Sequence, residues 1–180
     1  MRYSAVAGRY AKALLDVAID LGKEDEYGEL LKLSSKIYES LREFFDDPTV
    51  DSSKKFRKMV ELLESAVKLD NPFRNFLSIV FERKRQKYLP MMVLLYGDMK
   101  IEAEGKIPVD VYTPQELSEE EKEILRKFVK KHAMREPVFR EKIDESLIAG
   151  VRLEFQGMSY DTSIKGRMAK IAREIFGKGW

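Results

Sequence analysis

Apolar residues recur every three or four positions through most of the first hundred residues, which is the spacing of helices that bury one face. The pattern predicts helices over residues 4–21, 24–44, 51–67, 71–85 and 89–103. Asn71, just before Pro72, is the expected N-terminal cap of the fourth of these helices, and Gly105 is expected to follow the last. No strand is expected before Gly105.

After Gly105 the pattern changes to alternation of apolar and polar residues, which is typical of strands with one buried face. Strands are predicted over residues 107–112, 137–143, 150–155 and 158–160, with a hairpin turn at residues 156–157. Ser118 and Glu121 have the spacing of a capping box that begins a helix between the first two strands. Thr162 or Ser163 is the expected cap of a closing helix.

Two small domains account for these two patterns. We expect an N-terminal all-helical bundle over residues 1–105 and a small C-terminal α+β domain over residues 106–180. The 180 residues are 44% hydrophobic and 36% charged, with a net charge of +2, a balance typical of soluble globular proteins. The longest apolar stretches are well short of the roughly 18 residues that cross a membrane, so no direct membrane insertion is expected.

The chain offers few groups for catalysis. It has no Cys and a single His, which excludes thiolate nucleophiles, Cys-ligated zinc and metal sites with two His ligands. Glycine-rich phosphate loops are also absent from the sequence. Residues 119–121, all Glu, fit the first turn of a helix, and His132 fits the last turn of the same helix. We therefore expect no enzyme activity, no cofactor, no metal and no small-molecule substrate.

A basic stretch at residues 83–87 raises the alternative of a small nucleic-acid-binding adaptor. No aromatic residues interleave with these cations as stacking platforms would, and a helix C-terminus also favours cations. Residues 1–105 carry 18 basic and 18 acidic side chains, and the remainder carries 15 and 13. Neither half is basic enough to predict nucleic-acid binding, so this function remains the second choice.

The predicted helices over residues 4–21 and 71–85 have unusually wide apolar arcs. Each arc covers roughly 200°, about twice the minimum for a helix that buries one side. A central position in the bundle would explain the width. The other explanation is a core on one side and a docked partner helix on the other, with Tyr10, Ala7 and Ala11 lining part of the groove.

Several stretches, in order along nearly the whole chain, resemble one family. The sequence GRYAKALLDVA at residues 8–18 resembles the opening helix of the ATP synthase delta subunit family, which includes the mitochondrial oligomycin-sensitivity-conferring protein. A stronger signature is IDESLIAGVRL at residues 143–153 followed by YDTSIKGR at residues 160–167. Shorter matches lie at residues 44–48, 75–77 and 88–90.

The resemblance implies a non-catalytic stator subunit of an F-type ATP synthase. In this family a six-helix N-terminal domain sits on the catalytic head and binds the N-terminal helix of an alpha subunit. The C-terminal domain meets the b subunits of the peripheral stalk. The location implied is peripheral, at the cytoplasmic face of the bacterial plasma membrane.

The resemblance also implies which residues bind the partner helix and which shape the C-terminal domain. The family's first and fifth helices form the head-binding groove; the fourth helix predicted above becomes the fifth if a short extra turn near residues 44–48 is counted. The residues expected to bind the alpha-subunit helix are Tyr10, Ala13, Ala7, Ala11, Phe73, Phe76 and Val80. In the signature of the C-terminal domain, Gly150 and Gly166 are expected to shape the backbone, Asp161 and Ser163 to act as caps, and Arg167 to complete the motif.

Overall fold

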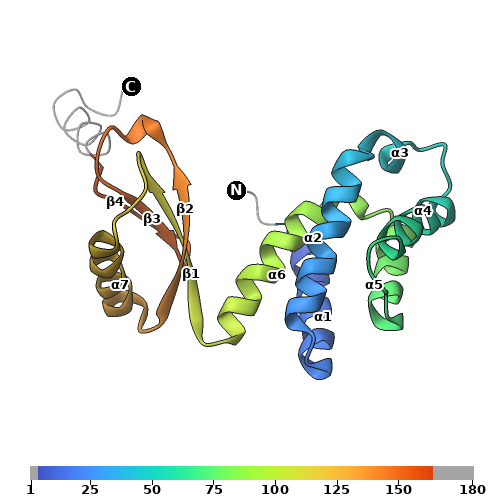
Figure 1. Cartoon of the computed structure of the whole chain (residues 1–180), viewed down its shortest axis with the longest axis horizontal. Helices are drawn as coiled ribbons and strands as arrows, with labels where there is room; N and C mark the ends of the chain where they lie inside the picture. The colour runs from blue at the N-terminus through green and yellow to red at the C-terminus, as the bar shows by residue number, and fades with distance from the viewer. Residues whose placement is uncertain (1–3, 164–180) are drawn as a thin grey trace. The chain divides into compact units, whose positions relative to one another are not determined.

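A computed structural model describes residues 4–163 of the chain (Figure 1). The chain divides into two compact units, one ending at Lys100 and the other beginning at Ile101. The expected boundary at residue 105 lies just after this division. The first unit is helical and the second carries a small mixed sheet.

Helices make up the first unit. The elements are α1 (Ala5–Leu21), α2 (Glu24–Ser40), α3 (Arg42–Asp46), α4 (Ser52–Glu64), α5 (Asn71–Glu82), the 3-10 helix η1 (Gln86–Tyr88) and α6 (Leu89–Ala103). Ser4 caps the start of α1, and Gly22 ends it in the left-handed conformation, with φ of 64°. As expected, residues 4–105 contain no strand.

The prediction of one helix over residues 24–44 is wrong at its end. The helix stops at Leu41, which has φ −119° and ψ 33°, and the chain continues as the short helix α3. The break allows Phe45 to be fully buried in the core, while the Tyr38 hydroxyl donates to the Asp46 carboxylate at 3.0 Å. Because α3 is a separate helix, the fourth helix of the sequence prediction is the fifth helix of the structure, α5.

The cap of α5 is Asp70 and not Asn71, so that prediction is also wrong. Asp70 Oδ1 accepts the Phe73 backbone N–H at 3.1 Å. Its Oδ2 accepts Lys23 Nζ at 2.9 Å and the Tyr27 hydroxyl at 2.8 Å. Burial acts to raise the pKa of Asp70, but the hydrogen bonds from Lys23, Phe73 and Tyr27 outweigh it and lower the pKa below its usual value. Asp70 therefore ties the first turns of α2 and α5 together.

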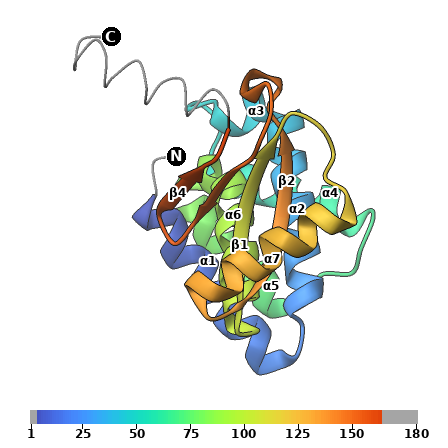
Figure 2. The ribbon, with the colours of Figure 1, turned by 90° about the vertical axis from the view of Figure 1, so that its left-hand side faces the viewer.

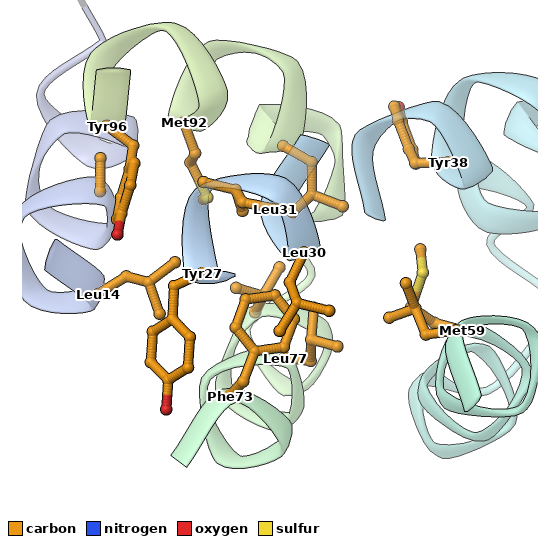
Figure 3. Packing of buried hydrophobic residues seen from close by; sticks show 14 of the residues in the cluster. Leu14, Tyr27, Leu30, Leu31, Tyr38, Met59, Phe73, Leu77, Met92 and Tyr96 are labelled. Carbon is orange, nitrogen blue, oxygen red and sulfur yellow. The ribbon is translucent and has the colours of Figure 1, made fainter. Parts of the chain in front are cut away.

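A single apolar core joins these helices. Figure 3 shows Leu14 of α1, Tyr27 of α2, Phe73 of α5 and Met92 of α6 in it, all buried. The rings of Tyr27 and Phe73 meet edge to face with centroids 5.4 Å apart. The core therefore uses the inner sides of both α1 and α5.

The second unit is a four-stranded sheet with the strand order β2-β1-β3-β4. The strands are β1 (Lys106–Thr113), β2 (Glu136–Ile143), β3 (Arg152–Phe155) and β4 (Met158–Asp161). Helix α7 (Glu119–Ala133) connects the parallel pair β1 and β2, and it begins with the predicted capping box of Ser118 and Glu121. Gln156 and Gly157 both have positive φ and form the predicted turn between the antiparallel strands β3 and β4.

Helix α7 lies across one face of this sheet (Figure 2). The residues of β1 that point toward it, Ile107, Val109 and Val111, are buried. The side chains of the alternate positions form a polar network: Arg140 and Lys142 each lie 2.9 Å from Asp110, and Arg152 lies over the Tyr112 ring at 4.3 Å. The predicted closing helix lies outside the described residues.

Candidate partner-binding surface

Residues 4–163 do not contain a group of three or more His, Asp or Glu side chains placed to hold a metal ion. His132 packs against the preceding turn of α7. Its ring centroid lies 4.2 Å from that of Phe128, and its Nδ1 lies 2.8 Å from the Phe128 carbonyl oxygen. Glu121 serves the capping box, where hydrogen bonds from the Ser118 backbone and side chain lower its pKa. Both groups therefore have structural roles in α7.

A hollow of about 370 Å³ lies beside α2, and its apolar lining residues are Leu30, Leu33 and Val67. Its other lining residues carry charges of both signs, and two of them, Lys32 and Glu29, form an ion pair at 2.6 Å. All of its charged lining side chains are exposed, so none of them is a buried polar group of the kind that orients a small ligand. No helix within residues 4–163 is long and apolar enough to cross a membrane.

The structure divides the expected groove residues into two groups. Ala7, Ala11, Phe73 and Val80 are fully buried in the core of the first unit. A partner could touch them only if the helices separated, so in this structure they support the surface from beneath. Tyr10 and Phe76 are half-buried and Ala13 is exposed, so these three are accessible to a partner.

Tyr10 and Phe76 join α1 and α5 at the surface. Their rings meet edge to face, with centroids 6.3 Å apart and 66° between the planes. Ala13 follows Tyr10 by three residues on α1, so the two lie on the same side of the helix. The three accessible residues therefore belong to one continuous patch.

Two further apolar residues extend this patch. Val17 on α1 is 40% exposed, and Ile79 on α5 is 49% exposed. Val17 follows Ala13 by four positions and Ile79 follows Phe76 by three, which places them on the same helix sides. We call Tyr10, Ala13, Val17, Phe76 and Ile79 the α1–α5 face.

The sequence contained the signal for Val17 and Ile79, because both lie within the wide apolar arcs. What it could not tell was which half of each arc faces outward. The structure places the inner half of both arcs in the core and leaves the outer half at the surface. The width of the arcs therefore reflects both packing and an exposed apolar stripe.

A cation lies at the edge of the α1–α5 face. The Arg85 guanidinium lies over the Tyr10 ring, 5.3 Å from its centroid, and its Nη1 donates to the Tyr10 hydroxyl at 3.3 Å. Arg85 follows the end of α5, so the two contacts fix the end of this helix beside Tyr10. The face is thus apolar along its length and basic near Arg85.

The signature residues of the second unit shape its backbone. Gly150 has φ of +84°, and an added Cβ there would lie 2.8 Å from the Thr162 carbonyl oxygen. Asp161 Oδ1 accepts the Ser163 backbone N–H at 2.9 Å and its hydroxyl at 2.6 Å. Ser163 is fully buried. Gly166 and Arg167 lie outside the described residues.

A family model and several relatives of known sequence match nearly the whole chain, and they name the same protein family. The family described as ATP synthase delta (OSCP) subunit matches residues 6–175. The ATP synthase subunit delta of Pseudothermotoga lettingae is 44% identical over 176 residues, which cover 97% of each chain. That of Thermotoga maritima is 47% identical over 180 residues, covering 99% of this chain and 98% of the relative.

A solved structure has a similar fold. It is a chain of the Toxoplasma gondii mitochondrial ATP synthase hexamer, with a TM-score of 0.65 and 21% sequence identity, and the match covers 96% of this chain and 98% of that one. At this identity the likeness supports the fold alone. The family match and the relatives carry the assignment: the chain belongs to the ATP synthase delta (OSCP) subunit family.

Proposed function

We propose that this chain holds the catalytic head of its ATP synthase to the peripheral stalk by binding the N-terminal helix of an alpha subunit on the α1–α5 face. As a delta subunit the chain is a non-catalytic, structural part of the complex. Its first unit, acting as a six-helix bundle, meets the head. Its second unit meets the b subunits.

One observation carries the proposal: the apolar side chains of the α1–α5 face line two helices that pack against each other. Phe76 is in ring contact with Tyr10, and Ile79 lies one turn farther along α5 with about half of its surface exposed. An amphipathic helix with its own apolar stripe is the partner that covers such a strip. Burying a large aliphatic or aromatic side chain gives about 1.5–3 kcal/mol, whereas an exposed ion pair gives about 0–1 kcal/mol.

The mechanical task explains why apolar contacts suit this role. Rotation of the central rotor exerts torque on the head, and ATP synthesis is coupled to ion flow only if the head does not turn with it. A stator link therefore needs a slow dissociation rate, which well-packed apolar contacts provide. The chain would work at the cytoplasmic face of the bacterial plasma membrane as a peripheral part of the complex.

Nucleic-acid binding is less well supported. The two halves of the chain are close to electrically neutral, and the accessible patch on α1 and α5 is mainly apolar. A nucleic-acid adaptor would need a basic face with phosphate contacts and steep salt dependence. The stator role accounts for the apolar face directly.

Reconstitution tests the proposed function. Membrane vesicles carrying ATP synthase stripped of this subunit are supplied with the full chain, and gradient-driven ATP synthesis is measured. The native chain should restore synthesis, and the Ile79→Asp variant should not, while Ile19→Asp, on another side of α1 and 45% exposed, should restore it. Equal restoration by the native chain and Ile79→Asp would refute the proposed role of the face.

A further inference from the structure

The basic cluster at the end of α5 exceeds what the helix itself requires. Residues 83–87 contain four cations, Arg83, Lys84, Arg85 and Lys87. A helix C-terminus carries a partial charge equivalent to roughly half an electron, so one cation more than neutralises it. Within residues 4–163, neither Arg83 nor Arg85 forms an ion pair. The cluster therefore has positive charge to offer a partner.

Two of these cations border the α1–α5 face. Arg83 comes four residues after Ile79, so it lies one turn farther along the same side of α5. Arg85 is held beside the face by its contacts with the ring and hydroxyl of Tyr10. The apolar stripe thus ends in two arginines.

The opposite end of the face carries the other sign of charge. Asp20 is exposed and follows Val17 by three residues on α1. It forms no ion pair within the described part of the chain. At 1.5 Å per residue, Asp20 lies about 15 Å along α1 from Tyr10, which is the reach of a helical segment of about ten residues.

We propose that this charge polarity fixes the direction of the helix bound on the α1–α5 face. Carboxylates of the partner helix meet Arg83 and Arg85 at one end, and a cation of the partner meets Asp20 at the other. A helix bound in the reverse direction would place like charges together at both ends. This inference rests on the proposed function, because it assumes that a helix occupies the face.

The absence of Cys from the chain allows a direct test by disulfide cross-linking. Glu82→Cys and Leu21→Cys place single thiols at exposed positions, one at the end of α5 and one at the end of α1. The probe is a synthetic peptide of the alpha-subunit N-terminal helix from the same organism, made with a Cys at one terminus or at the other. The peptide terminus nearer its acidic residues should cross-link to Glu82→Cys about tenfold more than to Leu21→Cys.

Charge variants separate direction from affinity. Adding Arg83→Met and Arg85→Met to each cysteine variant should reduce the preference to less than about twofold, and high salt should do the same. Arg85→Lys keeps the charge and should keep the preference. The matched pair Lys54→Met and Arg57→Met removes two exposed cations from α4 and should leave the preference unchanged.

Each outcome has a distinct meaning. Strong binding with equal cross-linking to both positions, or a preference that survives loss of both arginines, would overturn the inference while leaving the proposed function in place. Binding of anionic phospholipid vesicles through Arg83 and Arg85, with no directional preference for the peptide, would also overturn it. No binding of the peptide by the folded native chain would refute the proposed function and this inference with it.

Discussion

Tyr10 of α1 and Phe76 of α5 meet edge to face across 6.3 Å, and this contact makes one surface out of two helices. Both side chains are half-buried, so they belong partly to the core and partly to the accessible face. The Arg85 guanidinium lies over the Tyr10 ring of this pair. The geometry of the face therefore depends on a small number of aromatic contacts.

The first prediction concerns the strength of this contact. In a double-mutant cycle of Tyr10→Leu and Phe76→Leu, the coupling free energy should be about 0.5–1.5 kcal/mol, the range of edge-to-face aromatic pairs. The measurement is denaturant unfolding of the full chain for the four proteins. If the effects of the two substitutions add within about 0.3 kcal/mol, the two rings do not stabilise each other and the prediction is contradicted.

The second prediction concerns Asp70, which joins α2 to α5. Asp70→Ala should lower the free energy of unfolding by about 2 kcal/mol, because it removes a helix cap and leaves the Tyr27 hydroxyl without its acceptor. Asp51 caps α4 through local hydrogen bonds, the main ones from Ser53, so Asp51→Ala is the matched control and should cost about 1 kcal/mol. A cost at Asp70 no larger than that at Asp51 would contradict the linking role.

The same carboxylate predicts a pH dependence. The pKa of Asp70 is lower in the folded chain than its ordinary value of 3.8. Its contribution to stability is therefore complete above the unfolded-state pKa of about 4 and is lost as the pH falls through the lower, folded-state pKa. Unfolding measured between about pH 7 and pH 2 should show the native chain and Asp70→Ala converging in stability only at the acid end. A constant difference across this range would contradict the assignment.

The fourth prediction concerns Gly150 in the second unit. Gly150→Ala should destabilise this unit by about 2 kcal/mol or more, because φ is +84° and the new Cβ would lie 2.8 Å from the Thr162 carbonyl oxygen. Gly157 also has a positive φ, of +73°, but an added Cβ there meets no atom within 4 Å. Gly157→Ala should therefore cost only about 1 kcal/mol. Amide hydrogen exchange in β1 and β3 compares the two variants. Equal protection in both would show that the contact between the new Cβ and the Thr162 carbonyl oxygen does not destabilise the unit.

Local patterns were enough to predict many elements of the fold. The side chains of Ser118 and Glu121 each accept a hydrogen bond from the other residue's backbone N–H. The start of α7 can therefore be predicted from the four residues 118–121 alone. Gln156-Gly157 similarly predicts the turn of the last hairpin. Both features depend only on residues that are close together in the sequence, so the sequence alone is enough to predict them.

Features set by distant residues were not predictable. Asn71 is as good a cap as Asp70 by local rules, and only Lys23 and Tyr27, more than forty residues away, favour Asp70. The break at Leu41 similarly depends on the burial of Phe45 against the ring of Phe81, with centroids 5.6 Å apart. The family resemblance named Tyr10, Ala13 and Phe76 together with Ala7, Ala11, Phe73 and Val80, and neither it nor the sequence spacing could separate the accessible residues from the buried ones of the same arcs.

The central claim is that the α1–α5 face binds a helix of the alpha subunit, and calorimetric titration of the full chain with that N-terminal peptide tests it most directly. The native chain should bind with a negative heat-capacity change, the mark of apolar burial. Ile79→Asp should weaken binding at least about tenfold, since it places a charge within an apolar contact. Ile19→Asp, with nearly the same exposure, should bind as the native chain does. Absence of binding by the folded native chain, or equal weakening by both variants, would contradict the account.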